Sequence, residues 1–385
     1  MMAQRGIIEG INPARIVWCC EQVRLQLEDF AGQIKIPLKK LQNGSLTFNQ
    51  LKKVARFFGY GVLFFLDEEL PDTGNIHSPA FRSLTNQGVV LDVKMSKLIR
   101  NVEWHRDFYL SLMEESDSEF YFEKPKLKGE TADEKAIEIR NWLHLDGDNN
   151  QKKKTFETYR ELFARKGIFT FLSTGYRGNW KIENDDFEGF SINHEKMPVI
   201  FVKKSFEKRQ VFTLFHELAH LLLHDKKRAM MDSNENFRHN TAKRIEYEAN
   251  EFAGKCLIPS ETLEHIAAQT PENPRDYDAA FKDFSDKNCV SVEAVLVRLL
   301  MRRQISHEQY QQYRVLKKEE KIPQSSGQPK RYRHTEPAKI FGKHYVRSVL
   351  FALDEEQITL SKASNHLDKI KIEEFDKMRS HAFHH

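Results

Sequence analysis

Apolar residues recur at helical spacing through the first seventy residues of the chain. The clearest case is a predicted helix over residues 47–59, whose apolar face consists of Leu51, Val54, Ala55 and Phe58. Weaker patterns of the same kind predict helices over residues 13–27, 27–34 and 37–43, and stop signals stand at Asn43-Gly44 and at Gly59-Tyr60-Gly61. The apolar run 62–66 closes this part of the chain. We therefore expect an all-α domain over residues 1–70.

Toward the middle of the chain, apolar residues at helical spacing are followed by short strand-like runs. Residues 71–154 are predicted to form a helical connector, with helices over 90–115 and 132–145. A further helix ends at Gly167, and three short runs rich in β-branched and aromatic residues predict strands over 168–172, 188–192 and 198–202. Two helices follow, over 208–224 and 241–257. A helix, a small sheet and two helices indicate an α+β domain, which we place at residues 155–316, in a chain that is mainly helical.

The last part of the chain is predicted to contain a linker and a small domain. Residues 317–338 are polar, basic and contain Pro, which is typical of a linker. Residues 339–385 are predicted to form a small C-terminal domain with a helix over 359–367. In that domain we expect Lys343, His344 and Arg347 to face solvent rather than to take part in catalysis.

Composition and charge narrow the class of protein. The hydrophobic fraction of 40%, with 28 Phe, excludes global disorder. The 60 basic and 56 acidic residues nearly balance, so the net charge of +4 gives no overall signature of a nucleic-acid binder, although a local DNA-binding surface stays open. The four cysteines lack metal-ligand spacing. No apolar run approaches the roughly 20 residues that span a bilayer, and we expect a cytoplasmic protein without membrane association.

The helix predicted over residues 208–224 carries the chemistry-bearing run His216-Glu217-Leu218-Ala219-His220. Residues four apart share one face of a helix, so His216 and His220 can point at one metal ion, and Glu217 can reach a water beside that ion. The flanking positions are apolar on most sides. Buried polar groups are costly without partners, so their presence in such a helix needs a reason. The alternative is a pair of hydrogen-bonded core histidines.

A third metal ligand is expected on the helix that follows. Glu246 can supply a carboxylate, and Asn250, four residues on, can hydrogen-bond the outer nitrogen of a ligating histidine. Glu248 is the second choice for the ligand, and the alternative for both carboxylates is a solvated helix face. We expect His224 to pack or to face solvent, because a third turn of the helix adds about 5.4 Å of rise.

These residues predict the chemistry of a zinc peptidase. Zinc lowers the pKa of water and polarises a peptide carbonyl, while Glu217 accepts the proton of the water and passes it to the leaving amine. The strand over residues 199–202 precedes the helix and could be a sheet edge that binds an extended substrate.

The motifs resemble those of the ImmA/IrrE family of zinc metallopeptidases. Besides the His-Glu run and Glu246-x-x-Ala249-Asn250, the resemblance includes the segments 187–191 and 198–200 and covers roughly residues 155–300. It implies a zincin-like fold of the gluzincin type, with zinc bound by His216, His220 and Glu246 and with Glu217 as general base. It also implies a metalloendopeptidase that cleaves or inactivates a specific regulatory protein, a repressor or an antitoxin, in stress, mobile-element or phage-related regulation.

The first seventy residues resemble a helix-turn-helix domain of the Xre type, which implies DNA binding and transcription regulation. The chain departs from that pattern at residues 37–44, where the recognition helix is too short. We expect its polar side chains to meet DNA or a partner; these are Lys39, Lys40, Gln42 and Asn43. The alternative is a domain for dimerisation or for docking a partner.

Three hypotheses about function remain at this point. The chain could be a peptidase that acts on a helix-turn-helix repressor or an antitoxin, a DNA-binding transcriptional regulator with a structural zinc, or a toxin–antitoxin or defence component that uses the peptidase fold for protein interaction. Glu217 argues against the second hypothesis, because a purely structural site has no use for a base beside the metal. A homodimer is compatible with each of the three.

Overall fold

The computed structural model describes residues 6–23, 25–71, 93–115, 121–146, 153–176, 178, 180–182, 187–224, 235–319 and 332–383. The chain divides into two compact units, residues 1–105 and 106–385. The described residues form helices and one small sheet, which confirms a mainly helical α+β protein. The finer division into domains at 1–70, 71–154, 155–316, 317–338 and 339–385 stays a prediction.

The first unit is all-α. The side chain of Thr47 accepts the backbone N–H of Gln50 and begins α4, while Gly59 ends it in the left-handed conformation that glycine adopts easily. Phe30, Leu51 and Phe58 form part of the buried core. The elements are α1 (Pro13–Gln22), α2 (Leu27–Ile34), α3 (Leu38–Gln42), α4 (Phe48–Phe58), η1 (Val62–Leu66) and the first part of α7 (Val93–Glu115).

The second unit is built around a three-stranded sheet. Its strands are β1 (Phe169–Leu172), β2 (Gly189–Ile192) and β3 (Val199–Val202), in the order β1-β3-β2. β3 pairs in parallel with β1 and antiparallel with β2. The strand at 199–202 is therefore central, and the prediction that it is a sheet edge is wrong: both of its sides are already hydrogen-bonded.

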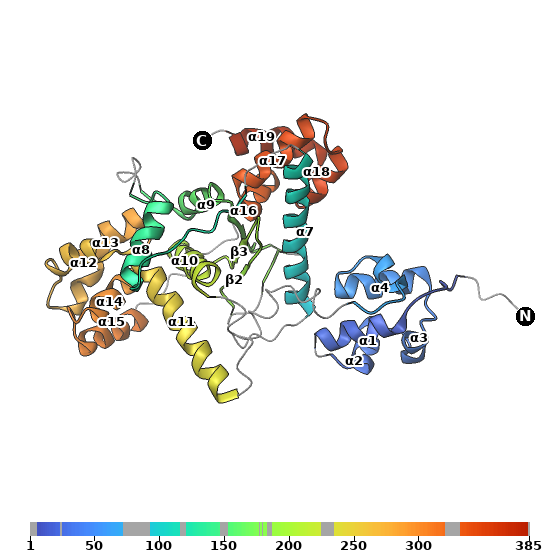
Figure 1. Cartoon of the computed structure of the whole chain (residues 1–385), viewed down its shortest axis with the longest axis horizontal. Coiled ribbons are helices and arrows are strands. Elements are labelled where there is room, and N and C mark those ends of the chain that lie inside the picture. The colour runs from blue at the N-terminus through green and yellow to red at the C-terminus, as the bar shows by residue number, and fades with distance from the viewer. Residues whose placement is uncertain are drawn as a thin grey trace, which may run out of the picture. The chain divides into compact units, whose positions relative to one another are not determined.

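Two helices pack next to the sheet and carry the candidate site (Figure 1). α10 (Glu207–Leu223) lies against β2 and β3, and α11 (Glu235–Leu257) packs along α10. α11 begins before the predicted residue 241. The helices of the unit that surround this layer are α8 (Ala132–Trp142), α9 (Phe156–Ala164), α12 (Ser260–Ala267), η3 (Pro274–Asp276), α13 (Tyr277–Asn288), α14 (Val292–Met301) and α15 (His307–Glu319).

The C-terminal helices pack on the sheet rather than standing apart from it. The buried guanidinium of Arg160 donates hydrogen bonds to the carbonyl of Thr170 in β1 and to those of Ala338, Lys339 and Ile340. These helices are η4 (Arg333–Thr335), α16 (Glu336–Phe341), α17 (Lys343–Asp354), α18 (Leu360–His366), η5 (Ile372–Glu374) and α19 (Phe375–Phe383). Both described ends of the segment predicted as a linker, 317–319 and 332–338, therefore belong to helices or border them; residues 320–331 lie outside the described residues.

One expectation about this region is wrong. His344 does not simply face solvent, because its Nε2 lies 3.3 Å from the hydroxyl of Tyr109 and its ring packs near Phe169. Arg347 also has a partner, since its Nε donates to the carbonyl of Ala382. The packing of α17 against segments far away in the sequence accounts for both contacts.

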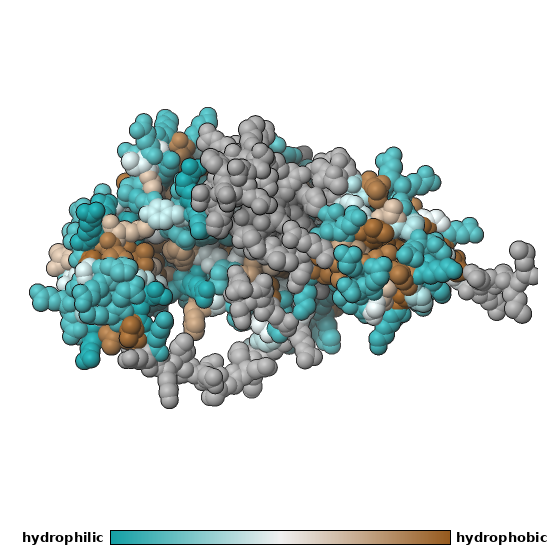
Figure 2. Space-filling model, turned by 90° about the horizontal axis from the view of Figure 1, so that it is seen from below, coloured by the Kyte–Doolittle hydropathy of each residue, from teal (hydrophilic) through white to brown (hydrophobic). Residues whose placement is uncertain are grey.

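Hydrophilic side chains dominate the face shown in Figure 2, and hydrophobic ones form scattered patches between them. Within the described part of the chain, no helix has the length and the apolar character needed to cross a bilayer.

Candidate metal centre

The central element of the candidate site is α10, whose side chains are buried on nearly every side of the helix. Leu214, Phe215, Leu218 and Ala219 are fully buried between the sheet and α11. Glu217 and His220 are buried in the same helix, and His216 is half-buried. Polar side chains in such surroundings require partners, and the sheet and α11 provide them.

Gly189 allows β2 to approach α10 closely. A Cβ atom at this position would lie 2.8 Å from the carbonyl oxygen of Phe201, 2.8 Å from Cγ2 of Thr213 and 3.5 Å from Cγ of Glu217. Any larger residue would push the strand away from the helix. Two positions further along β2, the Ser191 side chain hydrogen-bonds Glu217.

α11 places the carboxylate of Glu246 opposite the two histidines. Its buried face, which consists of Ala249, Phe252, Ala253 and Cys256, packs in the same core as α10. Glu246 and Asn250 lie at the border of that face, because residues three and four apart share a side of a helix. Both side chains therefore point toward α10, where their partners are.

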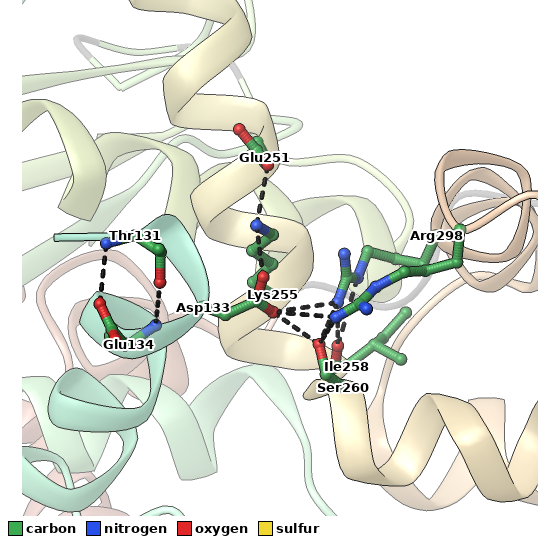
Figure 3. Close-up of polar contacts among 9 residues, drawn as sticks. Thr131, Asp133, Glu134, Glu251, Lys255, Ile258, Ser260 and Arg298 are labelled. Carbon is green, nitrogen blue, oxygen red and sulfur yellow. Dashed lines mark hydrogen bonds and ion pairs between the residues drawn. The ribbon is translucent and has the colours of Figure 1, made fainter. Parts of the chain in front are cut away.

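A charged cluster holds the C-terminal end of α11 (Figure 3). Nζ of Lys255 lies 2.7 Å from Asp133 at the start of α8 and 2.8 Å from Glu251 in α11 itself. The Arg298 guanidinium of α14 donates to the carbonyl of Ile258, at 3.2 Å from Nη2. Three helices are thus tied together at this end, which fixes the position of α11 and with it the position of Glu246.

Three donor groups converge on one point. Nε2 of His216 and Nε2 of His220 lie 3.0 Å apart, and the two carboxylate oxygens of Glu246 lie 3.3 Å and 3.5 Å from them. Among the described residues, these three form the group able to hold a metal ion. Donors at the corners of a tetrahedron around Zn²⁺, with bonds of about 2.0–2.1 Å, lie about 3.3 Å from one another. The observed separations fit a zinc ion.

The hydrogen bonds of the histidines favour the tautomer that a metal needs. Nδ1 of His216 lies 3.0 Å from Oδ1 of Asn250. An amide oxygen only accepts hydrogen bonds, so we assign the ring hydrogen of neutral His216 to Nδ1, which leaves a lone pair on Nε2. That lone pair points into the donor group, as a metal ligand requires.

The charges of the site also suit a cation. Burial lowers the pKa of His220 to about 3, so that its ring is neutral at pH 7. Burial opposes the ionisation of Glu246, yet the hydrogen bond with His216 and the electrostatic effects of the neighbouring histidines lower its pKa overall. Burial also lowers the pKa of His216, but Glu246 and Glu217 outweigh it and raise the pKa above its ordinary value. The donor group therefore attracts positive charge, whether a proton or a metal ion.

Glu217 has the properties of a general base. Its carboxyl is buried, and burial raises its pKa to about 7, against the opposing effects of His216 and the Ser191 hydrogen bond. Oε2 of Glu217 has no hydrogen-bond partner among the described residues. A buried carboxylate oxygen without a partner costs about 1–3 kcal/mol or more, and such an atom calls for a functional explanation. A base works best when its pKa is near the working pH.

Two further residues lie next to the donor group. Glu248, the second choice for the third ligand, lies outside the donor group, with Oε2 3.5 Å from Nε2 of His224 and Oε1 3.6 Å from Arg244. His224 was expected to pack or to face solvent. It packs, and its Nδ1 lies 3.0 Å from Nδ1 of His220. The third His at the same four-residue spacing was the signal for this contact in the sequence.

The candidate DNA or partner contacts belong to the first unit, whereas the metal centre belongs to the second. Lys39, Lys40, Gln42 and Asn43 are all exposed, on and just after the five-residue helix α3. Their exposure is compatible with contact to DNA or protein, and their role stays a prediction.

The comparisons with known proteins bear on the second unit alone. No curated protein matches the chain. Residues 180–300 match the model of the family described as Peptidase_M78, IrrE N-terminal-like domain. The matched segment contains His216, Glu217, His220 and Glu246, together with the strands β2 and β3. By this match, residues 180–300 are similar to the peptidases of the ImmA/IrrE family.

Proposed function

We propose that this protein is a zinc-dependent endopeptidase that cleaves a specific regulatory protein. The observation that carries the proposal is the spacing of His216, His220 and Glu246, which suits Zn²⁺, next to the buried and partly unpaired carboxyl of Glu217. A purely structural zinc site needs no such base. The similarity of residues 180–300 to a peptidase family supports the same reading.

The side chains of the site have different roles in peptide hydrolysis. His216, His220 and Glu246 would hold the ion, which when bound polarises a peptide carbonyl and lowers the pKa of water. Glu217 accepts a proton from the attacking water at Oε2 and returns it to the nitrogen of the leaving amine. The hydroxyl of Ser191 hydrogen-bonds the carboxyl of Glu217 and keeps it in place during both transfers.

The sheet offers a place for the substrate backbone. β2 pairs with β3 and forms one edge of the described sheet, and it packs against α10. An extended peptide could add to this edge by main-chain hydrogen bonds, which bring a peptide carbonyl toward the donor group. In this proposal β2, rather than residues 199–202, is the edge strand that binds an extended substrate.

The regulatory part of the proposal rests on the resemblance and on the first unit. The substrate would be a helix-turn-helix repressor or an antitoxin in the cytoplasm, and the exposed face of α3 would direct the peptidase to DNA or to that partner. A role as a DNA-binding regulator or as a toxin–antitoxin or defence component, with the second unit used for protein interaction, is the alternative. A homodimer is compatible with either.

The experiment compares zinc content and proteolysis in matched variants. Wild-type protein should contain about one zinc per chain in metal analysis and should cleave its helix-turn-helix repressor or antitoxin substrate. Glu217→Gln should keep the zinc and lose cleavage by at least a hundredfold, the lower range for general-base catalysis. Glu264→Gln, an exposed change on α12, serves as the control. Zinc-free wild-type protein, or full cleavage by Glu217→Gln, would overturn the proposal.

A further inference from the structure

A chain of three side chains leads away from the donor group on its outer side. Nε2 of His220 faces His216 and Glu246, and its Nδ1 lies 3.0 Å from Nδ1 of His224. Nε2 of His224 lies in turn 3.5 Å from Oε2 of Glu248 in α11. We call these three residues the His220–His224–Glu248 chain. It connects the end of α10 to α11.

The direction of the hydrogen bonds follows from the first contact. Two ring nitrogens 3.0 Å apart can share only one hydrogen, so one Nδ1 donates and the other accepts. If Nε2 of His220 is to keep a lone pair for a metal, its Nδ1 must carry the hydrogen and donate to His224. His224 then carries its own hydrogen on Nε2. That atom is buried, has no hydrogen-bond partner among the described residues and faces the carboxylate of Glu248.

His224 is not placed to be a metal ligand itself. The nitrogen that it presents to His220 meets Nδ1, on the opposite side of the ring from Nε2. A ligand for the same ion would have to approach Nε2. The arrangement instead parallels that of His216, whose Nδ1 meets Oδ1 of Asn250. Each of the two histidines therefore has an acceptor on its outer nitrogen, and both acceptors depend on α11.

Resting on the proposed zinc site, we infer that His224 is a positioning residue for His220 and that Glu248 orients His224. The hydrogen bond between Nδ1 of His220 and Nδ1 of His224 fixes the ring angle and the tautomer of His220. The negative charge of Glu248, acting through His224, makes Nε2 of His220 a stronger electron-pair donor to a cation. Outer partners of this kind commonly change metal affinity by about 10–100-fold.

The test measures zinc affinity, by competition with a chromophoric chelator, and the visible spectrum of the Co²⁺-substituted protein. His224→Ala should weaken zinc binding by about 10–100-fold and shift the Co²⁺ absorption bands. Glu248→Ala should cause a smaller loss. His224→Gln should recover most of the affinity, because its amide can accept from His220 and donate to Glu248. The exposed changes His265→Ala and Glu264→Ala on α12 are matched controls.

A double variant separates a chain from two independent contacts. If Glu248 acts through His224, then His224→Ala combined with Glu248→Ala should bind zinc no more weakly than His224→Ala alone. Thermal melting of the metal-free proteins checks folding, and if His224→Ala does not fold, His224→Gln and Glu248→Ala carry the test. Wild-type affinity in His224→Ala, losses that add in the double variant, or no recovery with Gln would each overturn the inference. A wild-type chain that binds no zinc would instead overturn the proposed function.

Discussion

Oδ1 of Asn250 accepts a hydrogen bond from Nδ1 of His216, with the two atoms 3.0 Å apart. Asn250→Ala should therefore lower zinc affinity by about 10–100-fold, because the ring of His216 loses the group that orients it. Asn250→Asp keeps an oxygen acceptor and should bind zinc more tightly than Asn250→Ala. Isothermal titration with Zn²⁺ measures both. Equal affinities in wild type and Asn250→Ala would show that the contact does not orient the ligand.

Gly189 should tolerate no side chain. Gly189→Ala places a methyl group 2.8 Å from the Phe201 carbonyl oxygen and from the Thr213 side chain, so β2 must shift away from α10. We expect a loss of about 1–3 kcal/mol in the free energy of unfolding, as for other overpacked sites, and a loss of peptidase activity. Gly175→Ala is the control, because among the described residues no heavy atom beyond its chain neighbours lies within 4 Å of its added Cβ. Urea unfolding that is unchanged in Gly189→Ala would contradict the expectation.

Removal of metal should lower the stability of the second unit. A ligand at a thousand times its Kd adds about 4 kcal/mol to the free energy of unfolding. Addition of zinc should therefore raise the Tm of the chelator-treated wild type and of Glu217→Gln. His216→Ala and His220→Ala should show no such response, because each loses a donor. Calorimetry distinguishes these outcomes, and a zinc-dependent Tm in both histidine variants would refute the ligand assignment.

The charged cluster at the end of α11 should make stability depend on pH. Burial raises the pKa of Asp133, but hydrogen bonds from Lys255 and Ser260 and the nearby positive charges lower it below its ordinary value overall. A carboxyl with a lowered pKa stabilises the folded state above the pKa of the unfolded chain, about 3.9, and loses that effect as the pH falls through the folded pKa.

Asp133→Asn should accordingly be less stable than wild type at pH 5–7, with a difference in the free energy of unfolding that shrinks below about pH 4. Denaturant unfolding at a series of pH values measures the difference. Glu264→Gln, on an exposed part of α12, should show little difference at any pH. A gap for Asp133→Asn that stays constant down to the lowest pH would contradict the assignment of the effect to this carboxyl.

The sequence predicted best what depends on neighbours along the chain. The start of α4 at the Thr47 cap, its end at Gly59 and the shared face of His216 and His220 all follow from local spacing, and the structure has each of them. Glu246 was predicted with Asn250 because four-residue spacing on α11 again sets one face. The structure brings both side chains to the histidines.

What the sequence did not predict depends on contacts between distant segments. The order of the strands is decided by pairing across the sheet, so the central place of β3 was missed. His224 was judged only by its distance from a metal along the helix. Its contact with the outer nitrogen of His220, and with Glu248 on another helix, requires the packing of α10 against α11. The same holds for His344, whose neighbour Tyr109 is far away in sequence.

The contacts of the Arg160 guanidinium limit where a truncated version of the chain can end. Its hydrogen-bonding partners in α16 are main-chain carbonyls, and they follow the polar segment that invites truncation. A fragment that stops before Ala338 would remove three carbonyl acceptors of this guanidinium and uncover the side of β1 against which α16 packs. Expression of the catalytic region by itself should therefore retain the final helices, even though the residues proposed for catalysis all precede them.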